Sequence, residues 1–279
     1  MKKPSMLMSS LFISILLLLL FIESNTAQEV DDETEFDYLR GSERGPDRWG
    51  HIREEWATCR TGRYQSPIDL LHRRVQVIPK SAEIVKFYNA GNATVRNRGH
   101  DIMIEWEGED SKIQINGTTY ILRQCHWHSP SEHTINGSRF AAELHLVHQT
   151  PDNNSIAVIG LLYKLGKPNR FLTTLMEKLE LVPNALDRTN AGEINPGEIK
   201  LRGRKYYRYM GSLTTPPCTE GVLWTLDRRI ATISEGQVAK MREVVHDDAE
   251  RNARPVQPLN GRKVGLYTTI KNQGKENHY

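Results

Sequence analysis

The chain of 279 residues carries 37 Lys and Arg against 34 Asp and Glu, so its formal net charge is only +3. A charge this mild and dispersed argues against a nucleic-acid-binding protein, and basic runs such as Arg202–Lys205 and Arg251–Arg254 are expected to be solvated surface. Hydrophobic residues make up 38% of the sequence. A chain of this length is expected to bury a substantial core within one domain.

The first 27 residues predict a secretory signal peptide. Lys2 and Lys3 precede an apolar run from Leu11 to Ile22, and small polar residues follow. Because the run is shorter than the roughly 20 residues of a membrane span, we expect cleavage near Ala27, with an uncleaved signal anchor as the alternative. No later segment is apolar enough to cross a bilayer, so no membrane anchor is expected.

The remaining sequence shows no internal repeat and no break in composition. We expect an acidic, disordered segment at 28–35, a single domain at 36–270 and a polar tail at 271–279. The GxGxxG, P-loop, CxxC, HExxH and GxSxG patterns are absent from the sequence. Their absence argues against dinucleotide-binding, nucleotide-binding, thioredoxin-like, zincin and serine-hydrolase functions.

The predicted elements are mainly strands. Alternating or apolar segments predict strands at Ile102–Trp106, Thr119–His128, Arg139–His148 and Ser155–Tyr163, and later at Val222–Leu226. One helix is predicted at Arg170–Leu181, where five apolar residues share a side: Phe171, Leu172, Leu175, Met176 and Leu179. A second helix is predicted at Ser234–Val245, because Ser234 and Gln237 have capping-box spacing.

Three histidines on two of these strands predict a metal site. Alternate residues of a strand face the same side, so Gln124, His126 and His128 project together, and so do Glu143, His145 and Val147. If the strands pair, three imidazoles converge with an amide and a carboxylate behind them. Three nitrogen ligands with one open position are typical of catalytic zinc, whereas structural zinc prefers four protein ligands.

Several long stretches around these histidines resemble the α-class carbonic anhydrases, in particular their secreted plant branch. The resemblance extends roughly from Phe36 to Thr269, and the stretches that carry it are GPDRWG (Gly45–Gly50), YQSPIDL (Tyr64–Leu70), RGHDIMIEW (Arg98–Trp106), HWHSPSEHT (His126–Thr134), AAELHLVH (Ala141–His148), GSLTTPPC (Gly211–Cys218), LWTL (Leu223–Leu226) and RPVQPL (Arg254–Leu259). It implies a large, twisted, mostly antiparallel central sheet with short peripheral helices. It also implies cis peptide bonds at Ser66–Pro67 and Pro216–Pro217.

The resemblance further assigns roles around the metal. His126, His128 and His145 would bind Zn²⁺, and Gln124 and Glu143 would accept hydrogen bonds from the far ring nitrogens of the ligands. Thr214 and Glu132 would orient a zinc-bound hydroxide that attacks carbon dioxide to give bicarbonate, with the Thr214 backbone N–H holding the substrate oxygen. The implied partners are therefore small molecules: CO2 and bicarbonate as substrates, and sulfonamides or anions as inhibitors.

Carbon dioxide is small and apolar, so its pocket needs apolar walls. The resemblance assigns the substrate pocket to Val147, Val158, Leu213, Thr214, Thr215 and Trp224, with Val222 nearby. His100 matches a histidine proton shuttle, and Tyr38 and Gln124 match residues that order water beside it. Arg98 and Met103 stand where relatives usually carry asparagine, so we expect intact hydroxide chemistry with slower proton transfer.

The three cysteines fit an oxidising compartment. Cys59 and Cys218 match a disulfide of secreted relatives, which leaves Cys125 as a small core residue that points away from the metal. Four sequons make N-glycosylation possible, at Asn92, Asn116, Asn136 and Asn153. Together with the signal peptide, these features predict a protein of the secretory pathway or the extracellular space.

Three functions are compatible with the sequence. The leading prediction is a secreted zinc enzyme that reversibly hydrates carbon dioxide. The first alternative is a storage or defence protein that keeps the fold while catalysis is weak, as the resemblance to secreted plant storage and nectar proteins implies. The second is a carbohydrate-binding module, for which basic patches and surface aromatics are the only support. All three ligand histidines, Thr214 and Glu132 are present, which favours the enzyme.

Overall fold

The computed structural model describes residues 29–268, apart from 80–83, 202–204 and 246–250. The predicted signal peptide and polar tail lie outside the described residues, as does most of the basic run at 202–205. Within the described part, no helix is both long enough and apolar enough to cross a membrane.

Strands dominate the described chain, as predicted. Thirteen of them form one sheet and two form a small separate one. The strands are β1 (Asp69–Leu70), β2 (Val75–Ile78), β3 (Ile84–Phe87), β4 (Gly91–Asn97), β5 (Ile102–Trp106), β6 (Lys112–Ile115), β7 (Thr118–His128), β8 (Thr134–Ile135), β9 (Ala142–Gln149), β10 (Ile156–Leu165), β11 (Arg188–Ile194), β12 (Lys205–Ser212), β13 (Glu220–Asp227), β14 (Ala231–Ile233) and β15 (Val264–Thr268). All five strands expected from the sequence are present, with bounds that differ by three residues at most.

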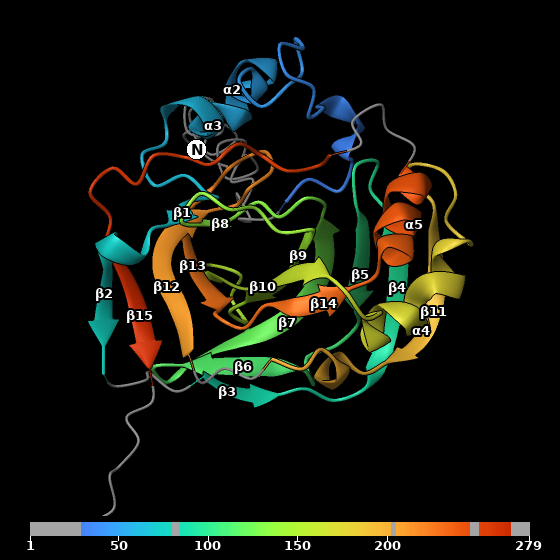
Figure 1. The fold of residues 1–279 in the computed structure, drawn as a ribbon. Coiled ribbons are helices and arrows are strands. Elements are labelled where there is room, and N and C mark those ends of the chain that lie inside the picture. Colours follow the sequence, from blue (N-terminus) through green and yellow to red (C-terminus); the bar gives the residue numbers. More distant parts are fainter. Residues whose placement is uncertain (1–28, 80–83, 202–204, 246–250, 269–279) are drawn as a thin grey trace, which may run out of the picture.

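The large sheet runs in the order β11-β4-β5-β7-β9-β10-β13-β12-β15-β2, with β14, β3 and β6 attached beside it. Most neighbours are antiparallel, whereas β10 pairs in parallel with β13 and β14, and β15 with β2. Figure 1 shows the sheet twisted strongly along this order. The predicted fold class, a large and mostly antiparallel twisted sheet, is confirmed.

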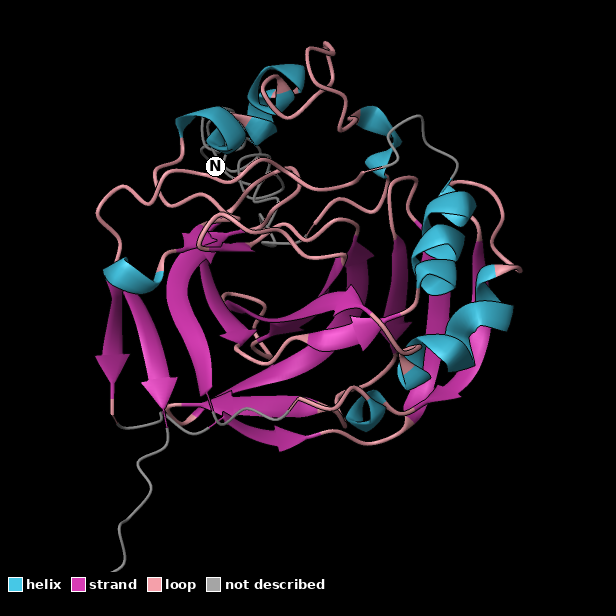
Figure 2. Cartoon of the chain, in the orientation of Figure 1, coloured by secondary structure: helices cyan, strands magenta, loops and turns pink. Residues whose placement is uncertain are grey.

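Short helices lie around the sheet, as Figure 2 shows. They are α2 (Trp49–Ile52), α3 (Thr58–Thr61), α4 (Arg170–Leu179) and α5 (Glu235–Val245), with 3-10 turns η2 (Glu33–Glu35), η3 (Glu54–Trp56), η4 (His72–Arg74) and η5 (Pro196–Glu198). Helix α4 ends two residues before the predicted position, since the chain turns at Leu181, which is exposed. The predicted capping box of α5 is present: the Gln237 N–H donates to Ser234 Oγ, and the Ser234 N–H donates to Gln237 Oε1.

The two faces of the sheet bury different clusters. One face packs against α4 and α5 and is apolar; it includes Trp127, Leu146, Ile159 and Cys125. The alternate residues of the same strands point to the opposite face, where Val147 and Val158 pack with Trp224. The three histidines belong to this second face. Strand alternation therefore separates a structural core from the candidate site.

The described part of the N-terminal acidic segment, residues 29–35, is ordered, whereas its composition favoured disorder. Glu33–Glu35 forms η2, and Asp32 caps it by accepting from the Thr34 N–H. Glu29 and Glu33 are buried. Both carboxylates lie against a buried arginine, Arg98, which the sequence did not reveal as their partner.

Candidate metal centre

Strands β7 and β9 bring the three histidines together. His126 and His145 are direct cross-strand partners, and His128 lies two residues further along β7 on the same face. The ring centroids are 5.1 Å apart for His126 and His128, 5.1 Å for His126 and His145, and 4.6 Å for His128 and His145. One nitrogen of each ring lies within 4.8 Å of the others, so the three could hold one metal ion.

The outward nitrogen of each ring donates to a fixed oxygen. His126 Nδ1 donates to Gln124 Oε1 at 2.8 Å, and His145 Nε2 donates to Glu143 Oε1 at 2.9 Å. The third donor, His128 Nδ1, reaches the Asn252 carbonyl at 2.7 Å. Sequence reasoning identified Gln124 and Glu143 but missed Asn252, which stands two residues before the stretch RPVQPL. These acceptors hold a proton on each outward nitrogen, so that the inward nitrogen of a neutral ring carries the lone pair that a metal can use.

The inward nitrogens fit a zinc ion. His126 Nε2 and His145 Nδ1 face each other at 3.3 Å, and two lone pairs this close repel unless a cation lies beside them. His128 Nε2 is buried and has no hydrogen-bond partner. Burial also lowers the pKa of His126 well below its ordinary value, which keeps the ring neutral and able to bind a metal. Three neutral imidazoles form the donor set that catalytic zinc uses.

Glu143 is the most heavily engaged of the acceptors. Besides His145, it receives hydrogen bonds from His133 Nδ1 at 2.7 Å and from the backbone N–H groups of Glu132 and His133 at 3.0 and 2.8 Å. Burial works to raise the pKa of Glu143, but attraction to His133 and His145 and their hydrogen bonds hold it well below its ordinary value. Gly160 on the next strand leaves room for this carboxylate, because a Cβ there would lie 3.2 Å from Glu143 Oε1.

His133 was missed by the sequence reasoning, although it lies within the stretch HWHSPSEHT. Its Nε2 lies 2.6 Å from the Tyr209 hydroxyl, and its Nδ1 donates to Glu143. The ring therefore connects β12 to the carboxylate that orients His145. No sequence signal distinguished it from an ordinary buried histidine.

Thr214 and Glu132 lie in the buried interior, but no hydrogen bond joins them in this structure. Glu132 Oε1 accepts from the Arg254 backbone N–H at 2.9 Å, while Glu132 Oε2 is unpartnered and lies 3.5 Å from His128 Nε2. The hydroxyls of Thr214 and Thr215 are also buried without partners. These unpartnered groups are polar atoms that a metal and its associated water would be expected to satisfy.

A cavity of about 360 Å³ is lined by Gln124, the acceptor for His126, although none of the three histidines is among its described lining residues. Gln124, Val147 and Leu213 line it, as do Arg98 and Met103, and Met103 is the cross-strand partner of His126. Behind Val147, the predicted apolar wall continues across the sheet, since Val158 pairs with Val147 on one side and with Trp224 on the other. Val222 is buried in the same cluster.

His100 does not line this cavity among the residues that the structure describes. Its Nε2 donates to the Phe36 carbonyl at 2.5 Å, and the ring packs against Phe36 and Tyr38, with centroids 5.4 Å away in both cases. The side chain is buried. The structure thus places the predicted shuttle next to Tyr38, as expected, but engaged with the N-terminal segment.

Arg98 is fully buried and paired with carboxylates. It contacts Glu29 at 3.0 Å and Glu33 at 3.4 Å, and it also binds Asp101. Although burial acts to lower the pKa of Arg98, the three carboxylates raise it well above the ordinary value. Its charge is therefore compensated locally by carboxylates that the sequence did not reveal as its partners.

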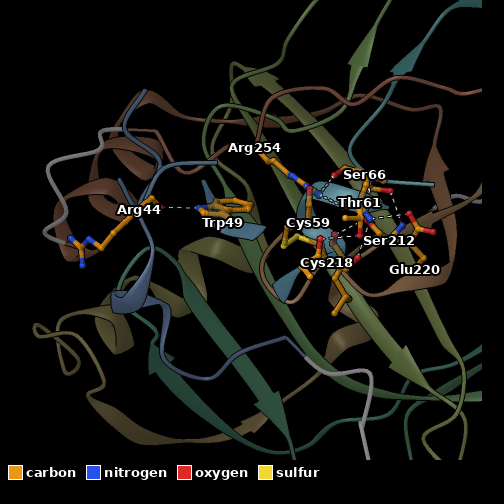
Figure 3. The surroundings of a disulfide bond; sticks show 12 residues. Arg44, Trp49, Cys59, Thr61, Ser66, Ser212, Cys218, Glu220 and Arg254 are labelled. Atoms are coloured by element: carbon orange, nitrogen blue, oxygen red, sulfur yellow. Dashed lines mark hydrogen bonds between the residues drawn. A yellow bond between two sulfur atoms is a disulfide. The ribbon is translucent and has the colours of Figure 1, made fainter. Parts of the chain in front are cut away.

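The predicted disulfide between Cys59 and Cys218 is present, and Cys125 is free and buried. Figure 3 shows the disulfide beside Arg254, whose guanidinium donates to the carbonyls of Cys59 and Ser66. The disulfide thus lies next to the residue whose backbone holds Glu132. The peptide bonds at Ser66–Pro67 and Pro216–Pro217 are cis as predicted, and Ser129–Pro130, which was not predicted, is also cis.

The sequons lie at the surface. Asn92, Asn116 and Asn136 are exposed, whereas Asn153 is half-buried at the rim of the cavity. Asn116, Asn136 and Asn153 have positive φ angles, which places them in turns. Their glycosylation remains a prediction.

Comparison with known proteins agrees with this geometry. The family model for eukaryotic-type carbonic anhydrase matches residues 44–268. Alpha carbonic anhydrase 7 of Arabidopsis thaliana is 50% identical over 243 residues, which are 87% of this chain and 88% of the relative.

Two solved structures are also similar. Dioscorin complexed with ascorbate has a TM-score of 0.81 and 39% identity, with 85% of this chain and 99% of that chain covered. The α-carbonic anhydrase of Thermovibrio ammonificans with sulfanilamide has a TM-score of 0.73 and 34% identity, with 82% and 98% covered. The family match spans nearly all of the described residues and includes the three histidines, so this chain belongs to the eukaryotic-type carbonic anhydrases, a family of enzymes.

Proposed function

We propose that this protein is a secreted zinc enzyme that catalyses the reversible hydration of carbon dioxide to bicarbonate and a proton. The observation that carries the proposal is the convergence of His126, His128 and His145, whose outward nitrogens each donate to a fixed acceptor. A zinc ion held by these three residues would lower the pKa of its water to about 7, the value for which carbonic anhydrase is the standard example, and so supply hydroxide at neutral pH.

The acceptors around the histidines set the geometry of the site. Gln124, Glu143 and the Asn252 carbonyl hold the protons on the outward nitrogens, so that all three inward lone pairs remain available. Outer hydrogen bonds of this kind orient metal ligands and raise their basicity. The chain thereby fixes the ligand positions before a metal arrives.

Thr214 and Glu132 would orient the nucleophile. Glu132 is fixed on one side by the Arg254 N–H, and its other oxygen is unpartnered, as is the hydroxyl of Thr214. A Thr214 hydroxyl that donates to Glu132 can only accept from the attacking oxygen, which aims a lone pair of that oxygen at the substrate. The Thr214 backbone N–H would hold an oxygen of CO2 while hydroxide adds to its carbon, which would give bicarbonate.

Val147, Val158, Leu213 and Trp224 would form the apolar wall that receives carbon dioxide, with Thr215 beside it. Apolar walls suit a substrate that offers little to hydrogen-bond. The proton would leave through His100, whose side chain must first release the Phe36 carbonyl. Arg98 and Met103 would slow this step, since neither offers the amide that relatives place there.

The signal peptide, the disulfide and the four sequons support a location in the secretory pathway or outside the cell. Because the Thermovibrio relative was solved with sulfanilamide, we also expect sulfonamides and small anions to inhibit this enzyme.

The test is stopped-flow CO2 hydration by the purified oxidised protein, with zinc measured on the same sample. We expect one zinc per chain, fast hydration and its loss in a sulfonamide. His128→Ala should abolish both zinc binding and hydration. His72→Ala is the matched control, because this histidine bonds Tyr207 away from the cavity. One zinc per chain without hydration would refute the proposal and favour a storage or defence role.

A further inference from the structure

The N-terminal segment places a carboxylate behind the metal centre. Glu29 is 95 residues from Gln124 in sequence, yet Gln124 Nε2 donates to Glu29 Oε2 at 2.9 Å. The same oxygen lies 3.6 Å from His126 Nδ1. Glu29 lines the cavity, and its side chain is only 6% exposed. The proposed function assigns no role to this residue.

Glu29 fixes the orientation of the Gln124 side-chain amide, that is, which of its two groups, the oxygen or the NH2, faces His126. A carboxylate can only accept hydrogen bonds, so it requires the NH2 group of Gln124 to face it. The amide oxygen then faces His126 and can only accept from Nδ1–H. If the amide were reversed, its oxygen would face the carboxylate and its NH2 group would face His126. The reversed amide would favour a proton on His126 Nε2, where it would block the metal.

Arg98 holds Glu29 in place. Its Nη1 donates to Glu29 Oε2 at 3.0 Å, and its Nε donates to Asp101 Oδ1 at 2.8 Å. The result is a continuous series of hydrogen bonds from Arg98 through Glu29 and Gln124 to His126. Such a series is stronger in a buried site than in water, because water does not compete for the donors.

We propose that Glu29 is a positioning residue for the metal centre, which fixes the Gln124 amide so that His126 presents an unprotonated Nε2 to zinc. The proposal rests on the proposed function, since it requires zinc at the three histidines. It gives the N-terminal segment a part in metal binding, although the segment lies outside the residues matched by the family model.

Glu33 provides a matched control from the same segment. Its buried carboxylate lies 3.4 Å from the same Arg98, but neither carboxylate oxygen has a hydrogen bond to Gln124 or to any other described residue. Burial raises the pKa of Glu33 well above its ordinary value, although attraction to Arg98 acts to lower it. Glu33→Gln keeps the shape of this side chain while it perturbs the same docked segment.

The experiment measures the rate at which the full-length mature protein loses zinc to excess chelator. Glu29→Ala and Glu29→Gln should each release zinc about 10-fold faster than wild type, the smaller end of the range for outer hydrogen-bond partners of zinc ligands. Gln at this position does not select the amide orientation, because it can either donate or accept. Glu33→Gln should match wild type. In a Gln124→Ala background, Glu29→Ala should add little, because the two residues act in series.

The visible spectrum of the cobalt-substituted protein separates positioning from general stability. Glu29→Gln should change this spectrum, which reports the ligand geometry. The metal-free Glu29→Gln and Glu33→Gln proteins should have the same melting temperature. Wild-type zinc release in both Glu29 variants would overturn the inference and leave the proposed function standing. If Glu33→Gln released zinc as fast as the Glu29 variants, the inference would be overturned, because any change that loosens the N-terminal segment would then have the same effect. A wild-type protein that binds no zinc would overturn both proposals.

Discussion

Removal of the disulfide should lower the free energy of unfolding by about 2–4 kcal/mol. Cys59 and Cys218 are 159 residues apart, and loop-closure entropy for a loop of that length gives about 5 kcal/mol as an upper value. Measured losses are usually smaller, since the unfolded chain retains structure. For a domain of this size, the expected loss lowers the melting temperature by roughly 6–12 °C.

The measurement is guanidinium denaturation of the wild type and of the Cys59→Ala/Cys218→Ala double variant, at equal zinc concentration because bound zinc adds to apparent stability. Reduced wild type serves as the control and should match the double variant, since Cys125, the remaining cysteine, is already free. A difference below about 1 kcal/mol at an equal m-value would show that the long loop does not restrict the unfolded chain, and the entropic argument would fail.

Catalysis by the folded double variant should stay within a few-fold of wild type at 25 °C. The Thr214 loop has other supports, because the Leu213 N–H donates to the Thr219 carbonyl and Ser66 and Ser212 bond each other through two N–H groups. A hundredfold loss of hydration with zinc retained would mean that the disulfide itself holds Thr214 in place.

Three further predictions concern the wall, the proton path and acid stability. Val158→Phe should fill the apolar wall beside Val147 and lower kcat/KM at least 10-fold with zinc content unchanged; unchanged kcat/KM would remove Val158 from the substrate pocket. His100→Ala should lower hydration in dilute buffer and be rescued by added imidazole, whereas equal rates at all buffer concentrations would show that His100 serves only to bind the Phe36 carbonyl. Burial lowers the pKa of His148 from about 6.5 to about 4. Between these two pH values the unfolded chain binds a proton that the folded chain does not. The free energy of unfolding therefore decreases as the pH is lowered from about 6.5 to about 4, by about 3 kcal/mol in all. His148→Gln should therefore lose less stability than wild type between pH 7 and pH 4, and equal losses in thermal melts would contradict this assignment.

Local pattern was sufficient to predict much of the site. Strand periodicity places His126 and His128 on one face of β7 and predicts that Cys125 points away, and the structure agrees on both points. The spacing of Ser234 and Gln237 predicted the start of α5, because capping involves neighbours in sequence. The disulfide and the roles of Thr214 and Glu132 came from family resemblance, since no local rule pairs residues so far apart.

Contacts between distant segments were decided by the tertiary structure alone. The acceptor for His128 is a backbone carbonyl 124 residues away, and a backbone group carries no sequence signature. Glu29 falls in a segment for which composition predicts disorder, because composition cannot show that Arg98 is buried opposite it. The orientation of His100 likewise depends on the Phe36 carbonyl, which the fold brings beside it. The sequence by itself thus determined which side chains could bind zinc, whereas the tertiary structure decided which groups hold them, because those groups become neighbours only when the sheet and the N-terminal segment pack together.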